Sequence, residues 1–183
     1  MATNKRWVLV ALSLLGTGLL FGVASSSGRS VLFSEYVSYL SDLAELHPPF
    51  QAGTAIFILQ KNVLTVLVSF ILSPILCLVP VLALTVNGWF IGYVVSIALQ
   101  KRSILFVLAG LLPHGILEIP AFILGEAAAL SFGVMALTAL MKKERRKDLL
   151  PNLKQNLCLL GVSLALLVPA AVIETYVTPL FFK

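Results

Sequence analysis

Residues 62–100 read NVLTVLVSFILSPILCLVPVLALTVNGWFIGYVVSIALQ and contain no charged side chain. An α-helix crosses the hydrocarbon core of a bilayer with about 20 apolar residues, so this stretch is too long for a single membrane span. We expect Asn87-Gly88 to break it. The prediction is one span over Val63–Val86, bent by its two prolines, and a shorter apolar segment over Gly88–Leu99.

The composition of the whole chain is typical of an integral membrane protein. Of the 183 residues, 59% are hydrophobic and only 11% are charged, and the mean hydropathy is +1.01. Soluble domains average about 45–50% apolar and about 25% charged residues. These values exclude a soluble enzyme, a disordered tail and a disulfide scaffold. They indicate a single transmembrane domain over residues 1–183.

The amino-terminal apolar run, Trp7–Ala24, follows the basic pair Lys5-Arg6. A secretory signal peptide is the competing interpretation, because small residues follow this run at 23–27. The run is long for a signal core, so we predict a retained first span. Gly18 and Gly22 have the spacing that suits close helix packing, and we expect homodimerisation through the glycine-bearing faces.

The remaining apolar segments are Ser103–Leu112, which we expect to end at Pro113-His114-Gly115, then Gly115–Met141 and Leu157–Val177. The predicted fold class is therefore all-α: a polytopic transmembrane helical bundle with about five spans plus a re-entrant or half-helix segment. The distribution of basic residues favours Gly88–Leu99 as the re-entrant segment, whereas the break at Pro113 favours Ser103–Leu112.

Basic residues predict the orientation, because Lys and Arg concentrate on the cytoplasmic side of membrane proteins. Two groups are expected there: Lys5-Arg6 and the cluster of Lys142, Lys143, Arg145, Arg146 and Lys147. The prediction is a multi-pass protein of the cell membrane with a cytoplasmic amino terminus and an extracytoplasmic carboxyl terminus. Beside an apolar helix, such a cluster is typical of a topology anchor that contacts anionic lipid, not of a nucleic-acid site.

Residues 25–60 are predicted to form an extracytoplasmic loop with an amphipathic helix. Phe33, Tyr36 and Leu40 fall on one helical stripe, which we interpret as a docking surface for protein partners. The helix would lie on the membrane surface or pack on the end of the bundle.

Five polar residues stand out within or beside the apolar segments, where an ionisable group is costly. They are His114, Glu118, Glu126, Glu174 and the neutral Asn87. His114 and Glu118 are four residues apart and share one helical face, and the last span can bring Glu174 to it. Glu126 would line the flank of the same cavity or face a helix interface.

Three interpretations of this cluster remain open. The first is structural, with His114 donating to a carboxylate and fastening the helices together. The second is a divalent-metal site formed by His114, Glu118 and Glu174, since an imidazole nitrogen and carboxylates are zinc or iron ligands. The third is a proton or cation relay through the bundle. We assign no catalytic residue, because no nucleophile elbow, phosphate-binding loop or dinucleotide motif occurs.

The pattern resembles the stage II sporulation protein M family over about residues 60–180. The residues that carry the resemblance are Asn87-Gly88, Pro113-His114-Gly115 with Glu118, Pro120 and Ala121, the small-residue stretch Gly125–Gly133, and Glu174 followed by Val177-Thr178-Pro179. The resemblance implies an all-helical bundle of about five spans. The family's namesake anchors peptidoglycan-degrading partners at the septal membrane of spore-forming bacteria, and no enzymatic activity comes with the resemblance.

The functional prediction is a membrane scaffold or assembly protein, expected to be a homo-oligomer that holds protein partners on the extracytoplasmic side. The alternative is a small transporter or a metal-dependent membrane protein that uses the intramembrane His/Glu cluster. A membrane protease is the weakest hypothesis, since it needs a nucleophile or a fuller metal-ligand set.

Overall fold

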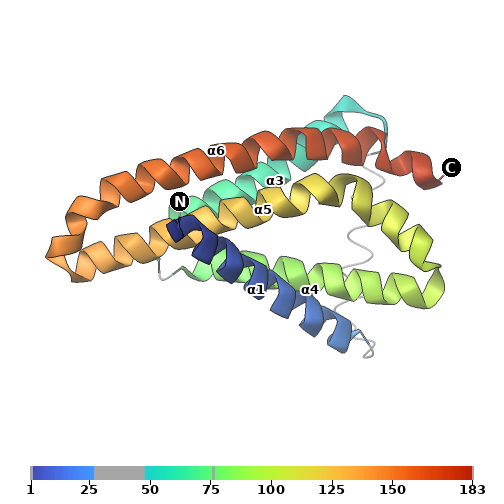
Figure 1. Cartoon of the computed structure of the whole chain (residues 1–183). Helices are drawn as coiled ribbons and strands as arrows, with labels where there is room; N and C mark the ends of the chain where they lie inside the picture. The colour runs from blue at the N-terminus through green and yellow to red at the C-terminus, as the bar shows by residue number, and fades with distance from the viewer. Residues whose placement is uncertain (1, 27–47, 76, 183) are drawn as a thin grey trace.

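The computed structural model describes residues 2–26, 48–75 and 77–182, and every regular element among them is a helix (Figure 1). The long helices are α1 (Ala2–Ser25), α3 (Ala52–Leu72), α4 (Leu78–Lys101), α5 (Ile104–Met141) and α6 (Arg146–Tyr176). Two short 3-10 helices follow α5 and α6, namely η1 (Lys143–Arg145) and η2 (Thr178–Phe182). Within the described chain, 5 helices are long and apolar enough to cross a membrane, which confirms the predicted all-α polytopic bundle.

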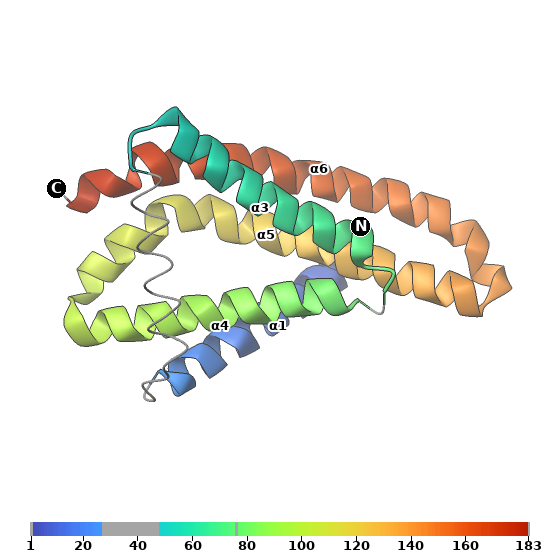
Figure 2. The same cartoon turned by 180° about the vertical axis from the view of Figure 1, so that it is seen from behind.

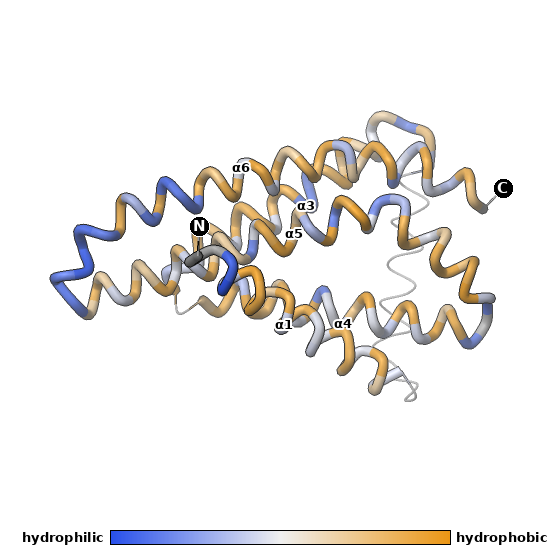
Figure 3. The backbone as a smooth tube through the Cα atoms, in the orientation of Figure 1, coloured by the Kyte–Doolittle hydropathy of each residue, from blue (hydrophilic) through white to orange (hydrophobic). Residues whose placement is uncertain are grey.

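The long helices run in alternating directions along the bundle, in the order α1, α3, α4, α5 and α6 (Figures 1 and 2). The end of α1, the start of α3, the α4–α5 turn and the carboxyl terminus gather at one end. The amino terminus and the α3–α4 turn lie toward the other end, beyond which the α5–α6 hairpin projects. Figure 3 shows hydrophobic residues along most of each helix and hydrophilic residues concentrated at the α5–α6 turn. The predicted docking stripe of Phe33, Tyr36 and Leu40 lies outside the described residues.

The single span predicted over Val63–Val86 is wrong, because the chain turns between α3 and α4. Pro74 carries no amide hydrogen, so the carbonyl of Phe70 loses the donor that would continue α3. The hydroxyl of Ser73 donates to that carbonyl instead, at 2.8 Å. Pro80 lies in the first turn of α4, where a helix needs no amide donor. The prolines expected to bend one helix therefore separate two helices.

Asn87-Gly88 does not interrupt α4, and close packing against α1 explains why a glycine stands there. Gly88 lies so near the backbone of Leu15 that a Cβ atom would overlap its carbonyl oxygen. The side-chain amide of Asn87 donates to the carbonyl of Ala83, one turn back in the same helix, at 2.7 Å. Asn87-Gly88 therefore lies within a continuous helix, where Gly88 allows α4 to pack closely against α1, and it does not form a turn.

Four glycines form the interface between α1 and α4, and a Cβ at any of them would overlap the backbone of the other helix: Gly18, Gly22, Gly88 and Gly92. Gly18 lies against Thr85 and Gly22 against Trp89, so the two helices run parallel, with one Gly-xxx-Gly pair on each. These faces are occupied within one chain. The prediction that these glycine-bearing faces mediate homodimerisation is therefore wrong. That the protein forms a homo-oligomer stays a prediction.

α5 continues through Pro113-His114-Gly115, where the sequence predicts a helix end. The expected half-helix over Ser103–Leu112 forms the first, angled stretch of α5, and Figure 1 shows the helix bending after it. Interior prolines cause such bends because they lack the amide hydrogen and crowd the preceding turn. Ser103 itself caps the helix by accepting from the amide of Phe106 at 3.3 Å. Gly88–Leu99 lies inside α4, so neither segment is re-entrant.

The apolar core has two parts, and α5 contributes to both. One cluster joins α5 to α1, α4 and the α3–α4 turn, and it includes Leu15, Leu84 and Ala127. The second joins α5 to α3 and α6, and it includes Val66, Ala128 and Leu167. The central helix α5 therefore connects an α1–α4 pair to an α3–α6 pair.

A bulky residue at Gly18 should force α1 away from α4. Overpacking a close interface costs about 1–3 kcal/mol, so we expect Gly18→Leu to lower the melting temperature of the purified protein in mild detergent by several degrees. Gly16→Leu is the matched control on the same helix, because no atom lies within 4 Å of a Cβ placed there. Equal melting temperatures for the two variants would contradict the packing described for α1 and α4.

Candidate functional site

A cavity of about 260 Å³ lies among the long helices, and each of the five contributes to its wall. Most of the wall is apolar, as expected inside a membrane bundle. Its polar members are Lys61, Asn62 and Thr65 from α3, Asn87 from α4, His114 and Glu118 from α5, and Glu174 from α6. A polar cavity within an apolar helical bundle is the feature of the described chain that most resembles a functional site.

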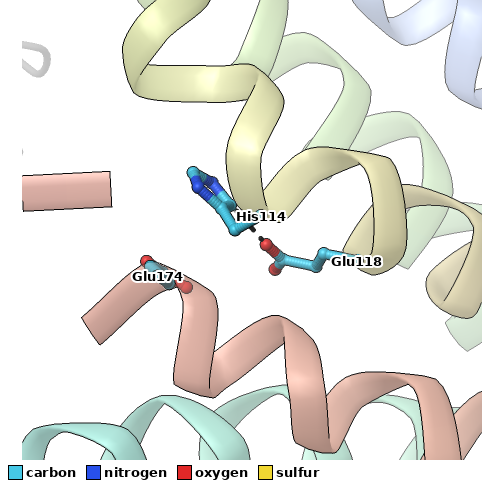
Figure 4. Close-up of side chains that lie close together, drawn as sticks. All are labelled: His114, Glu118 and Glu174. Carbon is cyan, nitrogen blue, oxygen red and sulfur yellow. Dashed lines mark ion pairs between the residues drawn. The ribbon is translucent and has the colours of Figure 1, made fainter. Parts of the chain in front are cut away.

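The bent part of α5 presents His114 and Glu118 to the cavity. The two residues are one turn apart, and the imidazole Nε2 lies 3.9 Å from Glu118 Oε2 (Figure 4). Both side chains are partly accessible, His114 to 15% and Glu118 to 30%. This separation is too long for a direct hydrogen bond, which spans about 2.7–3.2 Å.

The last turns of α6 complete the group with Glu174. One ligand atom from each of His114, Glu118 and Glu174 lies within 4.8 Å of the other two. Figure 4 shows the three side chains converging from α5 and α6. The structure thus brings together the three residues that the sequence suggested as a metal-ligand set.

Neighbouring polar groups hold the orientation of this triplet. The side-chain amide of Asn62 donates to Glu118 Oε1 at 2.9 Å. The other imidazole nitrogen, His114 Nδ1, lies 3.3 Å from the hydroxyl of Thr178 in η2. Thr178 therefore contacts Nδ1, and Nε2 is the ring nitrogen that lies near the Glu118 carboxylate.

Lys61 provides the cationic group of the cavity and acts on the Glu174 carboxylate through its charge. Lys61 and Asn62 were not predicted as site residues, because in the sequence they resemble the polar flank of a short apolar run. The apolar sequence continues after these two residues, and this could have indicated that they lie inside a span, because α3 runs on to Leu72. Thr178 was missed because it follows the last predicted span.

The formal charges in the cavity do not balance when His114 is neutral. Glu118 and Glu174 supply two negative charges, and Lys61 supplies one positive charge. An uncompensated carboxylate at membrane depth is costly, so a proton or a bound cation would stabilise the site. The arrangement can therefore bind a positive species or pass a proton through an intervening water molecule.

The other two predicted polar residues differ in their relation to the cavity. Asn87 lines the cavity, although its amide nitrogen is used within α4. Glu126 does not line the cavity; it is fully buried at the interface of α5 with α3, where the hydroxyl of Ser69 donates to its Oε2. Its Oε1 has no partner within the described chain. Of the two expectations for Glu126, the structure shows the helix interface.

The cluster of Lys142, Lys143, Arg145, Arg146 and Lys147 lies at the α5–α6 turn and is exposed. Arg145 is 3.4 Å from the exposed carboxylate of Asp148, and Arg146 Nε donates to the carbonyl of Ala139 at 3.4 Å. Its position at one end of the bundle agrees with a flanking role beside the membrane.

Comparison with known proteins identifies the family. The family model described as stage II sporulation protein M matches residues 10–179. Two proteins of Methanocaldococcus jannaschii, both named only as uncharacterized, are similar to the chain. One is 28% identical over 173 residues, 94% of this chain and 93% of its own length. The other is 31% identical over 125 residues, 67% of this chain and 55% of its own length. No solved structure matches. This chain therefore belongs to the stage II sporulation protein M family.

Proposed function

We propose that this protein binds a divalent metal ion in its intramembrane cavity and acts as a small transporter or a metal-dependent membrane protein. The observation that supports this most is the spacing of His114, Glu118 and Glu174 within 4.8 Å. Two ligand atoms placed about 2.1 Å from one ion lie roughly 3.0–4.2 Å from each other, for angles at the ion between about 90° and 180°. The 3.9 Å separation of His114 Nε2 and Glu118 Oε2 fits that range.

The charge of the cavity also favours a cation. Lys61 balances only one of the two carboxylates, so with a neutral His114 the cavity keeps a formal charge of −1, which attracts a cation. Asn62 and Thr178 would act as the outer hydrogen-bonding partners that orient ligands in metal sites. A purely structural network would favour close packing, whereas these side chains border an open cavity.

The metal content of the purified protein tests this function. After incubation with Zn²⁺ and removal of excess metal in mild detergent, we expect near-stoichiometric zinc in the wild type. His114→Ala and Glu118→Gln should lose it, because each removes one of three ligands. Glu126→Gln is the matched control, since it removes an intramembrane carboxylate outside the cavity and should retain zinc.

Two results would contradict the metal site: no zinc in the wild type, or equal zinc in wild type and His114→Ala. If the wild type binds no metal, a proton relay becomes the remaining functional interpretation of the cavity. That relay predicts proton flux into proteoliposomes that Glu118→Gln abolishes with little loss of fold.

The family assignment favours a second candidate function, a membrane scaffold that holds protein partners through the extracytoplasmic loop. The namesake's role as an anchor supports it. In a scaffold, His114→Ala should lower thermal stability and leave partner capture intact. Replacement of Phe33, Tyr36 and Leu40 by Ala should abolish capture from native membranes. Partner capture that survives the replacement of Phe33, Tyr36 and Leu40 would exclude docking through this loop.

We infer that the amino terminus is cytoplasmic and the carboxyl terminus extracytoplasmic. The odd number of spanning helices among the described residues and the basic α5–α6 turn support this orientation.

Reporter fusions test the orientation. Alkaline phosphatase fused after Lys183 should be active, because the reporter folds only outside the cytoplasm, and a fusion within the α5–α6 turn should be inactive. The opposite activities would show an inverted protein.

A further inference from the structure

A second polar cavity lies at the basic end of the bundle, where the start of α1 meets the α5–α6 hairpin. Its volume is about 410 Å³. Three basic side chains line it: Arg6 from α1, Lys142 at the end of α5 and Arg145 from η1. Lys142 and Arg145 belong to the basic run, whereas Arg6 comes from a distant part of the sequence, so the fold adds a third cation to the two of the run. Among the described residues that line this cavity, none is acidic.

The remaining walls divide into a polar and an apolar side. Asn152 and Ser131 form the polar side, and they continue into a buried hydrogen-bonded group in which Asn156 donates to Ser131 at 3.1 Å. Trp7, Val10 and Val134 are among the apolar residues that line the other side. Tryptophan is enriched at the membrane–water interface because its ring is amphipathic. The cavity therefore combines a cationic rim, neutral hydrogen-bonding groups and an apolar wall.

These properties specify an amphipathic anion. Arginine and lysine together bind phosphate, with the guanidinium offering two parallel N–H donors. The apolar wall offers nothing to a free phosphate ion, whereas it matches the glycerol and upper acyl carbons of a phospholipid. Basic pockets between membrane helices on the cytoplasmic side are known to hold anionic lipid headgroups.

We propose that this cavity binds the phosphate headgroup of one anionic phospholipid, held by Arg6, Lys142 and Arg145 between α1 and the α5–α6 hairpin. The site goes beyond the cation-binding function and lies at the other end of the bundle from Glu174. It also divides the basic run into two classes. Lys142 and Arg145 line the cavity, whereas Lys143 and Lys147 are exposed basic residues outside its lining.

That division provides a matched pair of variants with the same change in net charge. The test uses delipidated full-length protein in mild detergent, incubated with phosphatidylglycerol and measured by native mass spectrometry. We expect about one lipid per chain in the wild type and in Lys143→Gln/Lys147→Gln. The Lys142→Gln/Arg145→Gln variant should bind at least about tenfold more weakly, because two direct contacts to the phosphate are lost. Arg6→Gln should weaken binding similarly, and Arg6→Lys should restore most of it.

Two ligand controls distinguish a lipid from a simple phosphate site. Phosphatidylcholine, which is zwitterionic, should bind weakly, and inorganic phosphate at millimolar concentration should not displace phosphatidylglycerol. Melting temperatures measured without lipid establish that the variants remain folded.

Three outcomes would overturn the proposal: no lipid retained by the wild type, equal weakening in the two double variants, or full displacement by inorganic phosphate. The second outcome would mean that diffuse charge and not this cavity attracts the lipid. The third would mean a site for phosphate alone.

Discussion

The bundle is built around α5, which packs closely against neighbouring helices on both of its sides. Gly125 lies against Val66 and Ser163, and Gly133 lies against Ser73 and Cys77, so near that an added Cβ would overlap them. Lipid chains are as apolar as Leu side chains, so membrane helices associate through close packing and not through hydrophobic exclusion from water. The glycines of α5 therefore bring this helix close to α3, α6 and the α3–α4 turn, while Ala127 packs in the cluster that α5 shares with α1 and α4.

The same helix also contributes to the wall of the polar cavity. Its second half packs tightly through alanines and glycines, whereas its first stretch bends near Pro113 and carries larger and polar residues. His114 and Glu118 lie where the bend occurs, and α6 ends nearby with Glu174. The bend and the end of α6 together leave a polar cavity within an otherwise apolar bundle. Ionisable groups retained at such a cost are commonly functional.

Much of this architecture was predictable from the sequence, because hydropathy counts spans well. The number of spans and the convergence of His114, Glu118 and Glu174 follow from apolar length and helical spacing. The helix boundaries were harder, since proline and glycine each have two roles. Pro74 ends a helix but Pro113 only bends one, and Gly88 serves packing where a turn seemed required. Tertiary contacts decide between these roles, and a single sequence does not display them. Lys61 was missed for the same reason, because a cation inside a span resembles a span boundary until its partners are known.

The proposed coordination of one metal ion by His114, Glu118 and Glu174 can be tested by a cobalt titration followed by visible absorption. Co²⁺ reports its ligands through d–d bands whose position and intensity depend on coordination number and donor type. We expect saturable bands at one Co²⁺ per chain that disappear in His114→Ala and persist in Glu126→Gln. Bands that are absent from the wild type, or unchanged in His114→Ala, would contradict it.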